Sequence, residues 1–243
     1  MSTFVLVHGG WSGGWTWEKV VPLLEEAGHQ VEAPDLPGHG DDRTPIPEVS
    51  FQGYAARICQ VLDAQPEPVV LVGHSSGGSV ISQAAEQRPD KVKMLVYLAA
   101  FLLRDGEVLL SVAGNDTESL ILPNLVMSED QMSATIREDV IREALLADCS
   151  DEDVKRAKSR FVPQAVAPFA TPLAVTEDNF GRVPRVYIET LQDRAISPSV
   201  QKEMYEMYER LSCQKVISMD TSHSPFFSAP EELAGHLEVL ARA

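Results

Sequence analysis

The N-terminal part of the chain alternates short apolar runs with longer amphipathic segments. The apolar runs end in glycine turns or polar residues, as buried strands do, and the segments between them carry apolar residues at helical spacing. We predict strands at Thr3–Val7, about His29–Ala33, Val69–Val72 and Val92–Ala99. The predicted helices are Trp15–Ala27, about Ser50–Ala64, and a helix from Ser75 to about Gln87. This alternation indicates an α/β fold, in which helices cover both faces of a parallel sheet.

The alternation stops between about Arg104 and Asp178, where polar and helical stretches follow one another without a clear buried strand. We predict helices there at Glu129–Ala147 and Asp151–Lys158, and interpret residues 104–178 as a helical insertion. Strands and helices then alternate again, in the order Arg185–Glu189, Pro198–Arg210, Lys215–Met219 and Pro230–Ala241. We therefore expect residues 1–243 to form one domain, with a mostly parallel sheet of about six strands.

Composition and charge narrow the functional classes. The 44% of apolar and 23% of charged residues are typical of a globular protein. A formal charge of −16 opposes binding to nucleic acids or to anionic membranes. The first apolar stretch, Phe4–Val7, is too short for a signal peptide, and no apolar run approaches the ~18 residues of a membrane span. We expect a cytoplasmic protein. The wide spacing of Cys59, Cys149 and Cys213 argues against disulfides and a zinc site, and we expect no metal.

The segment Gly73–Gly77 has the pattern Gly-x-Ser-x-Gly, with Ser75 at its centre. It directly follows a predicted buried strand and opens a predicted helix. This is the sequence form of a nucleophile elbow, a strained turn that exposes a serine hydroxyl above the sheet. A serine hydroxyl is a weak nucleophile without a base, so this interpretation requires a histidine and an orienting acid, in the chain order Ser, Asp or Glu, His.

The position of each of the six histidines separates the candidates for the base. Only His223 lies on a loop that follows the last predicted strand, at the carboxyl edge of the sheet where such sites form. For the others a structural role is expected: His8, His39 and His74 lie in glycine turns, His29 begins a strand and His236 lies within the last helix.

The orienting acid should also follow a strand, and Asp193 does so four residues after Glu189. Glu189 itself is the second candidate. Asp220 is too close to His223 on the same loop to reach the far side of its ring, and Asp35 precedes the serine in the chain. We predict a catalytic triad of Ser75, Asp193 and His223.

Attack by a serine on an ester creates an oxyanion, which needs hydrogen-bond donors already in place. Two backbone amides are candidates. The amide of Ser76 lies at the start of a helix, where the helix dipole favours negative charge, and that of Gly10 lies in the glycine loop after the first strand. We predict that Gly10 and Ser76 form the oxyanion hole.

Several segments together resemble the plant methylesterase and hydroxynitrile lyase group of α/β-hydrolases, including its bacterial esterase relatives, some of which hydrolyse pyrethroid esters. The resemblance extends over nearly the whole chain. It is carried by Phe4–Gly9, Gly13–Trp17, Leu71–Ser75, Leu98–Phe101, Phe180–Gly181, Arg185–Ile188 and Ser222–His223. The resemblance implies the α/β-hydrolase fold, a lid-like helical cap formed by the insertion, and a mostly apolar pocket between cap and sheet, lined by Phe101.

Two residues separate the reactions found in this group. Its lyases place a threonine after the first histidine and a lysine after the catalytic histidine, whereas this chain has Gly9 and Ser224. We therefore favour a serine carboxylesterase that needs no cofactor and acts on small to medium, mostly apolar esters. A hydroxynitrile lyase and a receptor-type relative with slow turnover are the alternatives. The sequence does not determine the oligomeric state, and a homodimer is one of the assemblies that it allows.

Overall fold

The computed structural model describes residues 1–207 and 213–242. Within these residues the main sheet contains six strands in the order β2-β1-β3-β4-β8-β9, and all neighbours are parallel. The predicted parallel sheet of about six strands is confirmed. Its members are β1 (Thr3–Val7), β2 (Gln30–Glu32), β3 (Val69–His74), β4 (Val92–Leu98), β8 (Arg185–Thr190) and β9 (Cys213–Met219).

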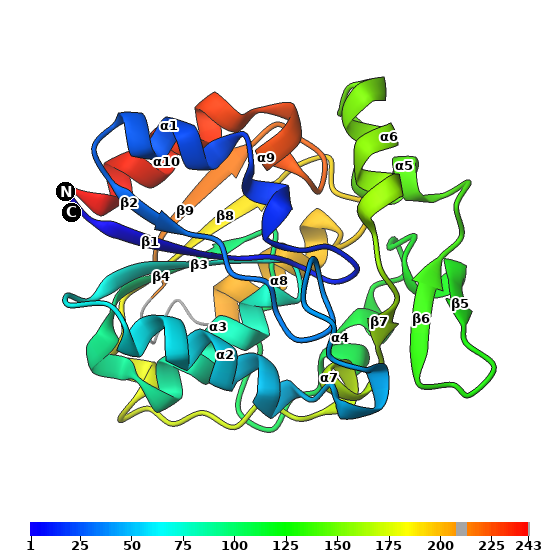
Figure 1. The fold of residues 1–243 in the computed structure, drawn as a ribbon, viewed down its shortest axis with the longest axis horizontal. Coiled ribbons are helices and arrows are strands. Elements are labelled where there is room, and N and C mark those ends of the chain that lie inside the picture. The colour runs from blue at the N-terminus through cyan, green and yellow to red at the C-terminus, as the bar shows by residue number, and fades with distance from the viewer. Residues whose placement is uncertain (208–212, 243) are drawn as a thin grey trace.

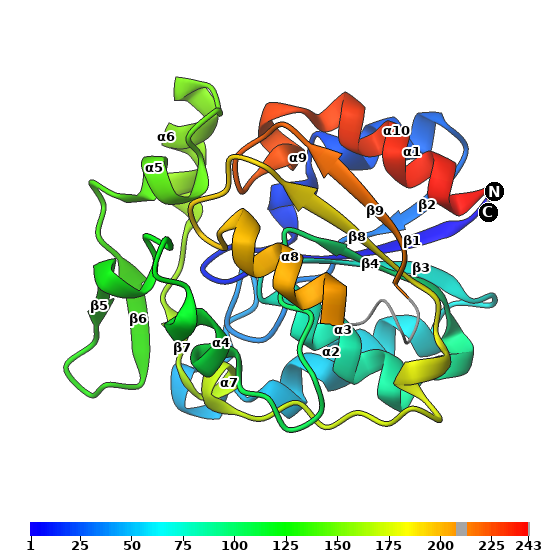
Figure 2. The ribbon, with the colours of Figure 1, turned by 180° about the vertical axis from the view of Figure 1, so that it is seen from behind.

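Helices cover both faces of this sheet (Figures 1 and 2). One face packs against α1 (Val20–Glu26), α9 (Pro225–Ser228) and α10 (Pro230–Ala241). The other packs against α2 (Phe51–Asp63), α3 (Gly77–Gln87) and α8 (Pro198–Met207). The predicted last residues of the helix Pro198–Arg210, numbers 208–210, lie outside the described residues. Short 3₁₀ helices lie at Gly14–Trp17, Ile46–Glu48, Pro89–Lys91, Leu122–Asn124 and Phe180–Arg182.

The alternation of side chains along β1 explains why the sheet is covered twice. Val5 and Val7 belong to the apolar core on the side of α2 and α3, whereas Phe4 and Leu6 belong to the core on the side of α1 and α10. Successive residues of a strand point to opposite faces, so an uninterrupted apolar run fills both cores. The carboxyl ends of these strands all lie at one edge, where the loops that carry the candidate site follow them.

A cap lies beyond this edge, formed by the chain between β4 and β8 (Figure 1). It contains helices and a three-stranded antiparallel sheet in the order β5-β6-β7. Its elements are α4 (Leu109–Asn115), β5 (Leu125–Met127), β6 (Ser133–Ile136), α5 (Ile141–Leu145), α6 (Asp151–Arg160), β7 (Gln164–Ala165) and α7 (Ala167–Ala170). The predicted helical insertion does contain helices, but the expectation that it has no clear strand was wrong.

The predicted helix Glu129–Ala147 is the part of the cap that differs most from expectation. A turn precedes β6, in which Gln131 has a left-handed φ of 60° and the Ser128 hydroxyl donates to Asp130 at 2.6 Å. Only Ile141–Leu145 is helical. Strand β6 is four residues long, too short for its period of two to be distinguished from a helical pattern, and pairing with β5 and β7 decides its conformation. The predicted helix Asp151–Lys158 is present as α6.

The structure also bears on membrane-spanning helices and on the cysteines. No helix among the described residues is long and apolar enough to cross a membrane. Cys59 and Cys149 are buried free thiols, and burial raises the pKa of Cys149 to about 12. The side chain of Cys213 lies outside the described part of the structure.

Candidate active site

Ser75 occupies a strained turn between β3 and α3. Its φ of 54° lies in the left-handed region, which non-glycine residues rarely adopt. The turn is braced by hydrogen bonds from the Ser75 amide to the Leu98 carbonyl at 3.2 Å and from the Phe101 amide to the Ser75 carbonyl at 3.0 Å. Gly77 is needed beside it, because a Cβ there would lie 2.7 Å from the His8 carbonyl oxygen. This geometry is that of a nucleophile elbow.

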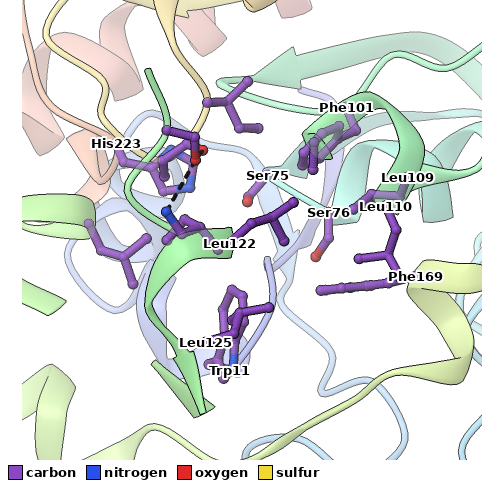
Figure 3. Close-up of a pocket in the computed structure, with 16 residues that line it drawn as sticks. Trp11, Ser75, Ser76, Phe101, Leu109, Leu110, Leu122, Leu125, Phe169 and His223 are labelled. Atoms are coloured by element: carbon purple, nitrogen blue, oxygen red, sulfur yellow. Dashed lines mark hydrogen bonds between the residues drawn. The ribbon is translucent and has the colours of Figure 1, made fainter. Parts of the chain in front are cut away.

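Asp193 and His223 come together from the loops after β8 and β9. The His223 Nδ1–H donates to Asp193 Oδ2 at 2.7 Å, and the two residues are only 2% and 4% exposed. His223 and Ser75 line the same cavity (Figure 3). The structure thus brings together the three residues of the predicted triad, although their catalytic roles stay a prediction.

The other acids considered from the sequence have different partners. Glu189 accepts hydrogen bonds from the hydroxyls of Tyr205 and Ser218, and Asp220 accepts one from the side chain of Gln192. Asp35 accepts the amides of Gly14 and Asp41. These carboxylates therefore have structural partners away from His223, which leaves Asp193 as the acid in contact with its ring.

Four further hydrogen bonds fix the carboxylate of Asp193. Its Oδ1 accepts the amides of Ala195 at 2.7 Å and Ile196 at 3.0 Å. Its Oδ2 also accepts the Thr190 hydroxyl at 2.9 Å and the Gln201 side-chain amide at 3.0 Å. Both oxygens are therefore satisfied by donors, and the carboxylate is held toward His223. The sequence does not single out Thr190 and Gln201, since nothing in their spacing separates them from ordinary polar residues.

Two of the remaining histidines make structural hydrogen bonds close to the site, as expected. The His74 Nε2–H donates to the backbone carbonyl of His223 at 2.8 Å, and burial holds the pKa of His74 well below its usual value. His8 donates from Nδ1 to the Gly9 carbonyl at 2.7 Å and accepts the Leu36 amide at Nε2. Burial, with a smaller contribution from His39, lowers the pKa of His8 to about 3. Both rings are therefore uncharged at neutral pH and have a structural role.

The predicted oxyanion-hole amides lie beside Ser75. Gly10 is in the loop after β1, and Ser76 is the N-cap residue immediately before α3, an eleven-residue helix. Among the described residues, neither amide donates a hydrogen bond to a partner within the protein. Two unused donors next to a serine, one of them at a helix N-terminus, suit a developing negative charge.

The cavity above Ser75 is mainly apolar, with a volume of about 50 Å³. Figure 3 shows Ser75 and Ser76 between Phe101 on one side and Trp11 on the other. Phe101 thus lines the cavity, as the family resemblance implied. The other apolar lining residues are Trp11, Leu109, Leu110, Ala113, Ile121, Leu122, Leu125, Leu145, Phe169, Ala195 and Ile196. Among the described residues, no group of three or more His, Cys, Asp or Glu side chains is arranged to hold a metal ion.

The cap is hydrogen-bonded to the loops that carry the predicted triad. Asp148 accepts the amide of Ser222 at 2.9 Å and also its hydroxyl, next to His223. Asp116 accepts the Ser197 amide at 2.8 Å, close to the loop of Asp193. These cap residues were not singled out from the sequence, because a carboxylate on a polar segment carries no local sign of its distant partner.

Gln164 on β7 also connects the cap to the core, because its buried side chain bonds to residues from several parts of the core. Its Nε2 donates to the Tyr54 hydroxyl at 3.1 Å, and its Oε1 accepts from His39 Nε2 at 2.9 Å. The same oxygen accepts the amide of Trp11 at 3.4 Å. The cap strand is therefore anchored to the loop that carries Gly10.

A six-stranded parallel sheet with a serine elbow, and an acid and a histidine on later loops, is the architecture of an α/β-hydrolase. The sequence agrees, since the alpha/beta hydrolase family matches residues 4–236. The chain therefore belongs to that family.

Several characterised proteins are similar over nearly the whole length. The pyrethroid hydrolase of Sphingobium wenxiniae is 32% identical, covering 96% of this chain and 85% of the relative. Methylesterase 2 of Arabidopsis thaliana is 33% identical, covering 98% of this chain and 95% of the relative. A crystal structure of polyneuridine aldehyde esterase, 28% identical, superposes with a TM-score of 0.85 over 99% of both chains. These relatives carry the names of hydrolases and esterases, in agreement with the predicted class of enzyme.

Proposed function

We propose that this protein is a serine carboxylesterase that hydrolyses small to medium, mostly apolar carboxylic esters through an acyl-enzyme. The observation that carries the proposal is the buried 2.7 Å contact between Asp193 and His223, where His223 lines the same cavity as Ser75 on its strained turn. The apolar lining supports an apolar substrate. The names of the pyrethroid hydrolase and methylesterase relatives support ester hydrolysis.

The first half of the reaction forms the acyl-enzyme. His223 Nε2 takes the proton from Ser75 Oγ while that oxygen bonds to the carbonyl carbon of the ester. The electron pair of the carbonyl moves onto its oxygen, which is stabilised by the amides of Gly10 and Ser76. The tetrahedral intermediate then collapses, the bond to the alcohol oxygen breaks, and the alcohol leaves with the proton from His223.

Water completes the reaction by the same route. His223 takes a proton from a water molecule while the water oxygen attacks the acyl carbon. The bond between that carbon and Ser75 Oγ then breaks, and the proton returns to the serine oxygen. Asp193 orients the imidazole and stabilises its charged form. The four donors on Asp193 keep its oxygens in place, so that Oδ2 faces Nδ1 throughout the cycle.

The geometry around Ser75 weighs against cyanohydrin cleavage. A Cβ at Gly9 would lie 2.8 Å from the Cβ of Ser75, so the present backbone has no room for the threonine of the lyases. Ser224 carries a hydroxyl where those enzymes have a lysine, and a hydroxyl supplies no positive charge for cyanide. Both differences favour ester hydrolysis.

The organisation and setting of the enzyme are also proposals. We propose a single domain over residues 1–243 with residues 104–178 as the cap, acting in the cytoplasm. The reduced, buried thiols of Cys59 and Cys149 support a reducing compartment. A homodimer is the assembly to test, and light scattering coupled to gel filtration measures it directly.

Substitution of the nucleophile tests the proposed chemistry. Ser75→Ala should remove nearly all hydrolysis of p-nitrophenyl acetate and butyrate, a loss of about 10³-fold or more, because no other group can form the acyl-enzyme. The matched control is Ser82→Ala, which removes another buried serine hydroxyl from α3, one bonded to Gly78 and Tyr97. Thermal unfolding checks that both variants fold.

Two results would overturn the proposal. A Ser75→Ala variant that kept more than about a tenth of wild-type activity would mean that another group is the nucleophile. A wild-type protein with very slow turnover and no initial burst of p-nitrophenol would favour the receptor-type alternative.

A further inference from the structure

Two cavities meet at Ser75 and His223. The first, of about 50 Å³, extends toward the cap past Phe101. The second, of about 20 Å³, extends between Phe161 and Phe227. Four residues line both cavities, namely Trp11, Ser75, Leu145 and His223. Ser75 and His223 carry the proposed chemistry, and Trp11 and Leu145 are the two apolar residues that line both spaces.

Trp11 holds a backbone conformation that tryptophan rarely adopts. Its φ is 61°, in the left-handed region, and it directly follows Gly10 in the predicted oxyanion loop. A non-glycine residue in this conformation costs free energy and persists only where the surroundings hold it. A strained residue beside a reacting group therefore calls for a functional explanation, and the position of its side chain supplies one.

The cap holds Trp11 from three directions. Its carbonyl accepts the Val162 amide at 2.8 Å, and its own amide donates to Gln164 Oε1 at 3.4 Å. The indole Nε1–H donates to the carbonyl of Ala134 on β6 at 2.9 Å. The ring also meets Phe169 edge to face, with centroids 6.1 Å apart. Backbone and side chain are both fixed, so the indole is a rigid wall and not a mobile surface residue.

The sizes of the cavities limit what each can accept. About 10–15 Å³ measured in this way holds one water molecule, so the smaller cavity has room for about one or two heavy atoms. The larger cavity, bounded by apolar side chains of the cap, accepts a longer apolar group. An ester whose acyl part and alcohol part are both bulky would not fit the smaller cavity and would collide with the indole of Trp11.

We propose that Trp11 is a specificity-determining residue that divides the site into a wide and a narrow subsite. The enzyme then acts on esters that carry one longer apolar part and, on the other side of the ester group, a group of about one or two carbons. This inference rests on the proposed function, and it adds the shape of the substrate to the reaction.

The test compares esters that differ only in where their bulk lies. Methyl hexanoate and hexyl acetate each have one small side, whereas butyl hexanoate is bulky on both. Trp11→Leu keeps a Cβ and therefore the same backbone demand, but removes most of the wall. We expect it to raise kcat/KM for butyl hexanoate, relative to the better of the two one-sided esters, by about tenfold or more. Trp11→Phe, which keeps a ring but loses the bond to Ala134, should give a smaller rise.

Phe4→Leu is the control. Phe4 is a fully buried aromatic residue of β1 that lines neither cavity, and its ring meets His29 edge to face. Its substitution should leave the ratio between the esters unchanged. If Trp11→Leu and Trp11→Phe lowered the rates for all three esters equally, or if Phe4→Leu shifted the ratio as much, the inference about Trp11 would be wrong.

A binding measurement separates this inference from the proposed function. Ketones in which a methylene replaces the ester oxygen of the same three compounds are titrated calorimetrically into Ser75→Ala and into Ser75→Ala combined with Trp11→Leu. We expect the second variant to gain about tenfold in relative affinity for the ketone that is bulky on both sides. An unchanged affinity ratio would overturn the role of Trp11, whereas absent esterase activity in the wild type would overturn only the proposed reaction.

Discussion

The parallel sheet and the cap contribute to the same site in different ways. Loops after the sheet strands carry the residues to which we assign catalytic roles, namely Gly10, Ser75, Asp193 and His223. The cap contributes apolar walls and polar side chains such as Asp148 and Gln164, which bond to those loops. The sheet therefore positions the chemistry, and the cap shapes the space around it and braces the loops.

The two regions also differ in how they are stabilised. Every residue of β3 is buried, whereas on the cap strand β5 the side chain of Val126 is 48% exposed. Burial of apolar surface stabilises the sheet. The cap buries apolar residues such as Ile141 and Leu145 as well, but it also depends on short strands and on side-chain hydrogen bonds to the core. Changes in the sheet loops should consequently abolish activity, and changes in the cap should mostly modulate it.

The largest effect is expected at His223. His223→Ala should lower kcat/KM for p-nitrophenyl acetate by about 10³-fold or more, because both proton transfers pass through its ring. His74→Ala should retain measurable turnover, since His74 supports His223 through its backbone carbonyl and by ring packing but takes no part in the proton transfers. Steady-state kinetics on both purified variants decide the matter. Equal losses would show that the assignment of roles to these histidines is wrong.

An intermediate effect is expected from the buried histidines of the core when the pH falls. The folded pKa of His8 is about 3, below its ordinary value of 6.5, so His8 contributes nothing to the pH dependence above pH 6.5. Between pH 6.5 and 3 the unfolded chain binds a proton that the folded protein does not. The free energy of unfolding should therefore fall, by about 2 kcal/mol at pH 5 from His8 alone.

Urea unfolding at pH 7.5 and pH 5 measures this contribution. His8→Asn should be less stable at pH 7.5, because the hydrogen bonds to Gly9 and Leu36 change. It should nevertheless lose less stability than the wild type between the two pH values, because one titrating group has been removed. A pH dependence identical to that of the wild type would contradict the lowered pKa of His8.

The smallest effect is expected at the cap contact with the histidine loop. Asp148→Asn weakens a charge-assisted hydrogen bond to Ser222, and should lower kcat about fivefold while the protein stays folded. Asp151→Asn is a matched control, because Asp151 is an exposed cap carboxylate paired with Arg142. If the two variants had the same kinetics, the cap would not position His223 through Asp148.

Much of the fold and the core of the candidate site could be predicted without the structure. Apolar runs that end in glycine turns are strong local signals, and the elbow around Ser75 combines such a signal with a defined chemical need. The chain order of Ser75, Asp193 and His223 then restricted the choice of acid and base. Their contact was predictable because loops that follow parallel strands meet at one edge of the sheet.

The structure of the cap could not be predicted from local sequence patterns, for a physical reason. Its strands are two to four residues long, and β6 acquires its conformation by pairing with β5 and β7. The supporting roles of Thr190, Gln201 and Gln164 likewise depend on partners that are distant in the chain or lack any repeating pattern. Local propensity does not encode such contacts.

The sequence alone determined the parallel sheet, the strained turn of Ser75 and the order of the reacting groups, because each follows from local periodicity or from glycine at a close approach. Only the tertiary structure decided how the cap folds, what holds Asp193 in place and that Trp11 lines two cavities. Those features arise where segments far apart in the chain meet, and the space enclosed between them belongs to no single segment.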